Sequence, residues 1–226
     1  MLFLIGLLIA VLFALALSPA LRRAPLPFRI AAVLLAAGAA AAAQLDIESE
    51  LLLDWILPLF TKGALSAAFW ALVMWAGALP RGNRFGRKLL AVRGELSILA
   101  ALFTLCHAVL RGLLYLRQLL HPRFSPGAEF IITSLLAVMM LLIMLPLTVL
   151  SFRKVRRKVA PERWKRIQRL AYPFYGLIYV HVLVLYLPPA LQGAKGYAFT
   201  VLVYSAVWLA YLICRLRKRG QKPFHA

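Results

Sequence analysis

The chain has 226 residues, of which 63% are hydrophobic and only 15% are charged. Ordinary soluble domains are about half apolar and about a quarter charged, so this composition excludes a soluble enzyme with a conventional polar surface. The 27 basic residues outnumber 7 acidic ones, but they stand in short blocks between long apolar runs. This arrangement indicates membrane topology and contact with anionic lipid headgroups rather than with nucleic acid.

Seven apolar runs are each long enough to cross a bilayer, since a helix needs about 20 apolar residues to span about 30 Å of hydrocarbon. The expected spans lie near residues 2–19, 28–44, 56–79, 95–118, 130–151, 170–188 and 197–214. The first is interpreted as a retained span rather than a secretory signal, because its arginines follow the apolar run instead of preceding it. The alanine-rich second run is the weakest, which leaves six spans as the alternative. The runs predict an all-α polytopic transmembrane bundle.

Basic residues collect in alternate connections between these spans. Of the 27 lysines and arginines, 22 lie near 20–29, 80–94 and 152–169 or in the tail after Cys214. The positive-inside rule therefore puts the N-terminus outside and the C-terminus in the cytoplasm, as in a multi-pass protein of the inner (cytoplasmic) membrane. Acidic residues gather on the opposite side, where they either receive an outside partner or only solvate the connection: Asp46, Glu48, Glu50 and Asp54.

The chain divides into three parts by composition. Residues 1–55 hold two spans and the acidic outer connection, 56–214 hold five spans, and 215–226 form a basic tail. No connection exceeds about 18 residues and no glycine-rich nucleotide motif occurs, so we expect the function to lie within the bilayer. Cys106 and Cys214 lie inside apolar runs and form no disulfide framework.

Two histidines, His107 and His181, lie deep inside spans that both run outward from the basic side. Ionisable side chains in hydrocarbon are costly, which makes them functional candidates. By helix rise, His107 lies about 20 Å from Gly94 at the basic end, and His181 about 18 Å from Arg169. Two imidazoles at matched depth on parallel helices suit bis-histidine ligation of one b-type haem. The alternative is that each histidine only hydrogen-bonds to a neighbouring helix.

Two arginines, Arg111 and Arg117, occupy the outer half of the span that contains His107. Cations at this depth suit haem propionates, which need positive charge in a low-dielectric site. Arg111 is four residues past His107 and therefore shares its helix face. The alternative is that both arginines extend to the membrane interface.

A second haem is not expected from the residues themselves. His121 follows His107 by 14 residues, but it falls at the outer boundary and no histidine matches it after His181. The positions one haem layer closer to the cytoplasm hold Arg93 and Gln168, and neither side chain is a good iron ligand.

A series of short motifs runs along the chain. They are Thr61-Lys62-Gly63, Arg93-Gly94 before His107, Pro146-Leu147-Thr148 with Ser151, Arg163-Trp164, and Arg169-Leu170 with Tyr172 before His181. In this order and at these intervals, the stretch from about Thr61 to Cys214 resembles the ferric-reductase-like transmembrane domain family. In that family it is similar to the MsrQ-type branch, the haem-binding membrane subunit of bacterial methionine sulfoxide reductase systems. The resemblance covers about two thirds of the chain and omits the first two spans.

The resemblance implies that His107 and His181 correspond to the outer pair of haem ligands. The inner pair falls at Arg93 and Gln168, which departs from the family pattern and again leaves one haem b. Ferric reductases and NADPH oxidases carry a flavin and nicotinamide domain after the last span, whereas this chain ends twelve residues after Cys214. We therefore expect the electron-transfer membrane subunit of an oxidoreductase system. Electrons come from quinol or a separate flavoprotein and go to an extracytoplasmic acceptor or partner reductase, with quinone or FMN as further candidate cofactors.

A different function class uses the same bundle without a redox cofactor. In a transporter or assembly subunit, the two histidines are helix-packing residues. The basic connection 152–169 leaves two interpretations as well, because it either docks a flavin phosphate or cytoplasmic donor or only fixes topology and binds lipid. Trp164 within it is expected as an interfacial anchor. Glu95 is expected at the first turn of its span, where a helix N-terminus favours an anion.

Overall fold

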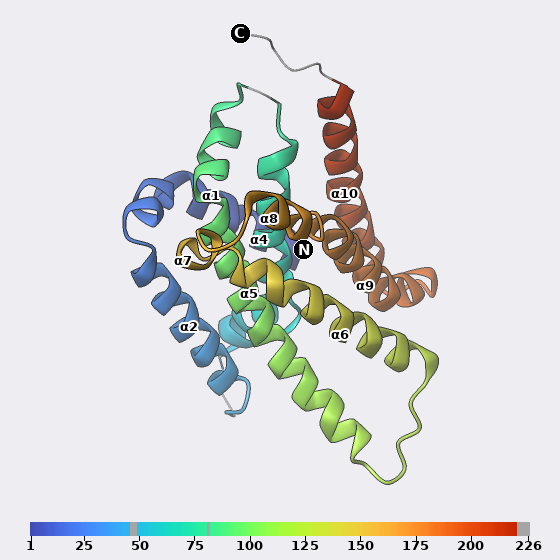
Figure 1. Ribbon diagram of the computed structural model, residues 1–226. Helices are drawn as coiled ribbons and strands as arrows, with labels where there is room; N and C mark the ends of the chain where they lie inside the picture. The colour runs from blue at the N-terminus through green and yellow to red at the C-terminus, as the bar shows by residue number, and fades with distance from the viewer. Residues whose placement is uncertain (46–48, 81, 221–226) are drawn as a thin grey trace.

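The computed structural model describes residues 1–45, 49–80 and 82–220, except for the side chains of Arg219 and Gly220 (Figure 1). These residues form helices and turns, without a strand among them, so the all-α prediction is confirmed. Asp46, Glu48, Arg81 and Lys222, which support the predicted orientation, lie outside the described residues. The elements are α1 (Leu2–Arg23), α2 (Pro25–Ala42), the π-helix η1 (Leu52–Ile56), α3 (Leu57–Thr61), α4 (Ala64–Ala78), α5 (Arg84–Leu119), α6 (Ala128–Val149), α7 (Arg153–Arg156), α8 (Pro161–Gln168), α9 (Ala171–Leu191) and α10 (Tyr197–Gly220).

Six helical segments are long and apolar enough to cross a membrane, and a seventh span arises if one bent pair is counted. The bent pair joins Leu52–Thr61 to Ala64–Ala78 at an angle of 49°. Each expected apolar run therefore corresponds to a helix or to this pair, including the alanine-rich run, which forms α2. The polytopic helical bundle is confirmed, and its third span is broken.

The break between α3 and α4 is built by glycine. Gly63 has φ +68°, a left-handed conformation that glycine adopts without a Cβ clash. Its N–H donates to the carbonyl of Phe60 and its own carbonyl accepts from Ala67, so one helix ends and the next begins at this residue. A short turn inside an apolar run thus exposes the last carbonyls of α3.

α4 is the centre of the bundle, and nearly all of its side chains are buried. It packs against α5 and α1, and more lightly against α10 and α9. α1 meets it through a face of small residues that includes Gly6, Ala10 and Ala14, which allow close helix approach. A Cβ at Gly6 would stand 3.0 Å from the carbonyl oxygen of Ala64. The first span is therefore an integral part of the helix packing.

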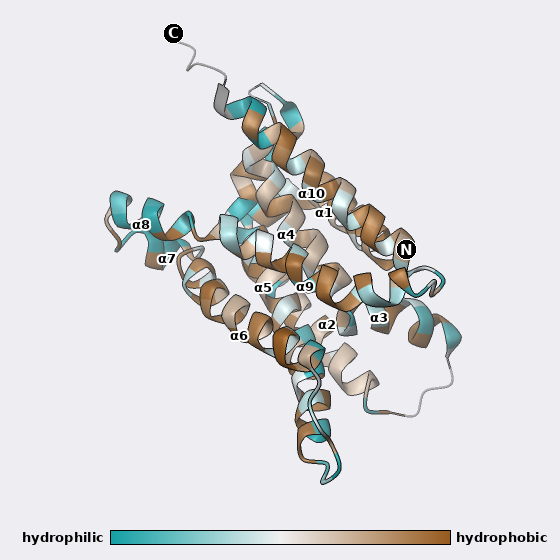
Figure 2. Ribbon diagram, turned by 90° about the vertical axis from the view of Figure 1, so that its right-hand side faces the viewer, coloured by the Kyte–Doolittle hydropathy of each residue, from teal (hydrophilic) through white to brown (hydrophobic). Residues whose placement is uncertain are grey.

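The basic side of the bundle, formed by the connections rich in lysine and arginine, differs from expectation in two ways. α5 begins at Arg84, where the Asn83 side chain accepts from the Gly86 N–H, and it runs for 36 residues. The expectation that Glu95 lies at a helix N-terminus is therefore wrong. The helix starts before the apolar run because the basic residues that precede Glu95 also form helix readily in water. The connection 152–169 also contains α7 and α8, whose hydrophilic residues stand out in Figure 2.

Candidate functional site

His107 is held by the broken span. Its Nδ1 lies 2.9 Å from the carbonyl oxygen of Thr61, the last residue of α3. Because a carbonyl only accepts, Nδ1 must carry the proton in this contact, and Nε2 of the neutral ring keeps its lone pair. Metal-binding histidines commonly have this arrangement, in which a backbone carbonyl fixes the tautomer and the ring orientation.

The His107 ring lies directly against Gly63. A Cβ built on Gly63 would stand 3.2 Å from both Cγ and Nδ1 of the ring and 3.3 Å from Cδ2. No ordinary residue fits there without moving the ring, and the positive φ disfavours one as well. The glycine that breaks the span also makes room for the histidine.

Arg111 shares the same carbonyl. Its Nε donates to Thr61 O at 2.9 Å, so one oxygen accepts from both side chains. The remaining guanidinium N–H groups have no protein acceptor in the described part of the chain. Arg111 is therefore positioned one turn outside His107, with donors available for an anion.

His181 lies on α9, half-buried. Its Nδ1 is fully buried and has no hydrogen-bond partner among the described residues. An electrostatic interaction with His107 indicates that the two rings share one region of the bundle. α9 packs mainly on α6 and α10, and α5 packs mainly on α4 and α2. α4 and α6 also touch both helices, whereas α5 and α9 have little or no backbone contact with each other.

The contacts of the two histidines differ. His107 bonds to a carbonyl at the end of α3, as a helix-packing residue would, whereas the buried Nδ1 of His181 has no partner among the described residues. A buried polar atom without a partner destabilises a fold by about 1–3 kcal/mol. With one unprotonated nitrogen available on each ring, the two imidazoles fit the bis-histidine donor set of a b-type haem.

The other predicted residues lie apart from this pair. Arg117 is exposed and donates to Oε1 of Gln44, which follows α2, at 3.2 Å. His121 is exposed, and its Nδ1 accepts from the Arg123 N–H at 3.4 Å. The structure places Arg111 beside His107 through the shared Thr61 carbonyl, whereas Arg117 is directed toward the segment that follows α2.

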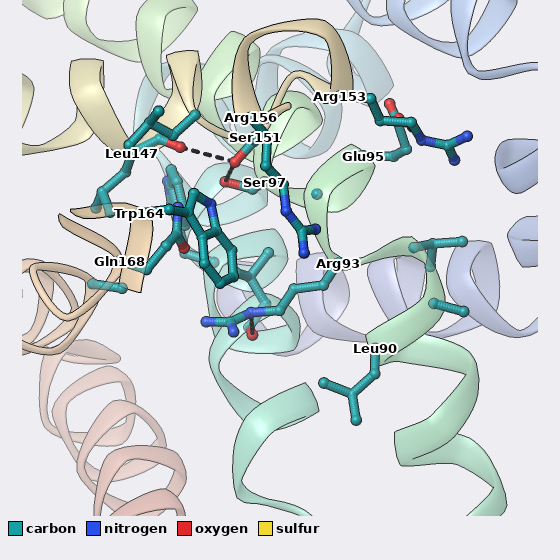
Figure 3. Close-up of a pocket in the computed structure, with 17 residues that line it drawn as sticks. Leu90, Arg93, Glu95, Ser97, Leu147, Ser151, Arg153, Arg156, Trp164 and Gln168 are labelled. Atoms are coloured by element: carbon teal, nitrogen blue, oxygen red, sulfur yellow. Dashed lines mark hydrogen bonds and ion pairs between the residues drawn. The ribbon is translucent and has the colours of Figure 1, made fainter. Parts of the chain in front are cut away.

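A second group of predicted residues meets on the basic side. Arg93 and Gln168, at the inner-haem positions of the resemblance, both line a cavity of about 270 Å³ (Figure 3). Trp164 lines the same cavity beneath the Arg156 guanidinium, 4.4 Å from ring centroid to Cζ. The expected interfacial anchor is therefore part of a cavity wall.

The tyrosines beside His181 contribute to packing. Tyr175 stacks on Trp208 at 4.1 Å between ring centroids, and the Tyr179 hydroxyl pairs with Ser205. Both partners lie on α10. These tyrosines therefore join α9 to α10.

Sequence reasoning missed two parts of this region. The first is the Thr61 carbonyl, a backbone group whose role no side chain reveals. The one feature of the sequence that points to it is Gly63, a glycine that interrupts an apolar run. The second is a buried ion cluster, in which Glu95 accepts from Arg29 at 2.6 Å and lies 3.8 Å from Arg153. Its members are 66 and 58 residues apart in the chain, a separation that no local pattern reveals.

Comparison with known proteins gives three findings. Residues 62–179 match the family described as "Ferric reductase like transmembrane component", a stretch that contains His107 and stops two residues before His181. The chain is 35% identical over 158 residues to an uncharacterized protein of Treponema pallidum (strain Nichols). That alignment covers 70% of this chain and 44% of the relative, so the chain spans less than half of that protein's length. No solved structure matches.

Proposed function

Because this chain belongs to the family of ferric reductase like transmembrane components, we propose that it is a b-type cytochrome of the inner membrane, similar to the MsrQ-type subunit. The family and the six apolar helices make it a multi-pass membrane electron-transfer component. In our proposal, electrons come from quinol or a separate flavoprotein on the cytoplasmic, basic side. They go to an extracytoplasmic acceptor or partner reductase. The proposal rests on the two deep histidines: the bond to Thr61 leaves Nε2 of His107 free, and the buried Nδ1 of His181 has no partner among the described residues.

In this proposal each histidine contributes one unprotonated nitrogen as an iron ligand. The Thr61 carbonyl holds the His107 proton on Nδ1, which directs Nε2 to the metal and makes the ring a stronger ligand. The haem supplies reversible one-electron exchange. The chain contributes ligation, a defined depth in the bilayer and nearby charge.

Arg111 is the proposed partner of a haem propionate. It lies one turn beyond His107 on α5 and has N–H donors to spare after bonding Thr61. A charge-assisted hydrogen bond to a carboxylate is about twice as strong as a neutral one. Arg117 is a weaker candidate, because it is exposed and already bonded to Gln44.

The electron donor has to approach the ligand pair from the basic side. His107 is about 20 Å along the helix from Gly94, and Arg93 and Gln168 are unsuited to holding an inner iron. A quinol, or the FMN of a flavoprotein, therefore has to reach into the bundle. This requirement favours small donors that enter between helices.

The test is the visible spectrum of the purified protein, oxidised and reduced with dithionite, with haem counted per chain. We expect one b-type haem per chain. His107→Ala and His181→Ala should each abolish the reducible spectrum. His121→Ala should leave it unchanged, because His121 is exposed and follows the end of α5. A colourless wild-type protein would contradict the proposal and favour a transporter or assembly subunit.

A further inference from the structure

The cavity on the basic side contains positive charge that no protein group neutralises. Four charged side chains line it: Arg93, Glu95, Arg153 and Arg156. Glu95, the one acid in this lining, is buried and already paired with Arg29 and Arg153. Neither Arg93 nor Arg156 has a carboxylate within 4 Å in the part of the chain that the structure describes. Two guanidinium groups therefore face the cavity without a counter-ion.

The cavity also contains an unused hydrogen-bond donor. Nε1 of Trp164 is buried and has no acceptor among the described residues. In Figure 3 the Trp164 ring lies beside the Arg156 guanidinium, and the Arg93 guanidinium lies below the ring. Arg93 donates only its Nε to the Val73 carbonyl, which leaves its terminal nitrogens available. Three side chains with N–H groups thus line one cavity.

The excess of donors and of positive charge defines the chemistry of a ligand. The ligand must be an anion with several acceptor oxygens. A phosphate ester offers about three such oxygens, whereas a carboxylate offers only about two. Arginine forks match phosphate geometry closely. The cavity volume of about 270 Å³ lies below the range of about 300–1,000 Å³ typical of larger organic ligands. A headgroup-sized anion suits this space better than a whole porphyrin does.

The position of the cavity agrees with this chemistry. It lies between α5, the end of α6, α7 and α8, where the chain is most basic. Basic pockets between transmembrane helices on the cytoplasmic side are typical sites for anionic headgroups. We propose that this cavity binds a phosphate-ester anion through Arg93, Arg156 and the Trp164 N–H. The proposal is independent of the haem, since it uses none of the residues near His107.

The source of the phosphate is either a phospholipid headgroup or a soluble phosphate ester. The first experiment is native mass spectrometry of the full chain in detergent, before and after addition of phosphatidylglycerol. The second is calorimetric titration of delipidated protein with inorganic pyrophosphate. A headgroup ligand predicts retained phosphatidylglycerol, whereas a soluble ligand predicts pyrophosphate binding.

The variants test the named donors. Arg93→Gln and Arg156→Gln should each weaken binding of the active probe by about tenfold or more, which corresponds to one charge-assisted bond. Trp164→Phe keeps an aromatic ring and removes only the N–H, so it should weaken binding less, by roughly fivefold. Arg157→Gln is the matched control, because Arg157 is exposed like its neighbour Arg156 but lies outside the cavity lining.

Absence of binding by both probes in the wild type, or equal binding by Arg93→Gln, Arg156→Gln and the Arg157→Gln control, would overturn the proposal. If an arginine variant does not fold, Trp164→Phe still decides the matter, because it leaves every charge in place. Haem content is measured in parallel on each sample. A colourless wild-type protein that still binds the phosphate probe, with weaker binding by the Arg93, Arg156 and Trp164 variants, would contradict the haem proposal and support the phosphate proposal.

Discussion

A single backbone atom, the carbonyl oxygen of Thr61, orients two of the proposed site residues. It accepts from His107 and from Arg111, both at 2.9 Å. The side chain at position 61 is not part of either bond. The conformation of the chain at Lys62 and Gly63, which directs this carbonyl, therefore matters more than the identity of residue 61.

Gly63→Ala should disturb the site. A Cβ in the left-handed region destabilises the backbone by about 1–2 kcal/mol, and here it would also stand 3.2 Å from the His107 ring. We expect reduced haem content and altered g-values of the oxidised haem in electron paramagnetic resonance. Gly112→Ala, at a helical position of α5 with open space around it, is the control. A wild-type resonance spectrum from Gly63→Ala would show that the ring is held by something else.

Arg111→Gln tests the propionate partner. A positive charge beside the haem stabilises the reduced form, so its removal should lower the midpoint potential. The expected shift is on the order of 60 mV, equivalent to about 1.4 kcal/mol for one electron. Arg117→Gln, at an exposed position where solvent screens charge, should shift the potential much less. Equal shifts in a redox titration of the two variants would rule out a specific role for Arg111.

At the scale of elements, the break in the third span is the feature that joins fold and site. A helix end leaves carbonyls without intrahelical partners, and in hydrocarbon such groups must be satisfied within the protein. At the end of α3, the Thr61 carbonyl is satisfied by hydrogen bonds from His107 and Arg111. A continuous helix through residues 52–78 would keep this carbonyl in its own backbone ladder.

The close contact between α1 and α4 gives a stability prediction. Gly6→Leu would place a side chain where even a Cβ meets the Ala64 carbonyl at 3.0 Å. Such overpacking typically destabilises by about 1–3 kcal/mol. We expect a lower melting temperature in detergent, followed by circular dichroism. Gly38→Leu on α2, which has open space around it, should melt like the wild type; identical melting of both variants would mean that α1 does not pack as described.

The ion cluster of Arg29, Glu95 and Arg153 ties α2 and α7 to α5. Glu95→Gln leaves Arg29, whose side chain is 22% exposed, without its carboxylate. The loss of unfolding free energy should be about 1–3 kcal/mol, less than for a fully buried pair because water reaches the arginine. The measurement is a double-mutant cycle with Arg29→Gln, in which the two effects should be strongly non-additive. Additive effects would show that the pair does not interact.

For the molecule as a whole, hydropathy predicts which segments cross the membrane but not where the helices end. All seven apolar runs became helices or the bent pair, because contact with lipid requires both apolar side chains and paired backbone groups. The same reasoning misplaced the start of α5 by about ten residues, since a helix does not stop at the membrane surface. Glu95 consequently lies well inside the helix and not at its end.

The candidate site was partly predictable for a related reason. Helix rise gives depth, so residue counts alone predict matched levels for His107 and His181. The Thr61 carbonyl, the Gly63 contact and the Glu95 cluster depend on how a turn and distant helices meet. Such tertiary contacts leave no periodic pattern in a single sequence.

The two histidine-bearing helices have little or no direct backbone contact, one packing mainly on α4 and α2 and the other mainly on α6 and α10. A metal shared by both rings would link these two helices directly. Its removal would loosen α9 while every helix stayed intact, so faster protease cleavage in the α8–α9 connection would precede any loss of helical signal.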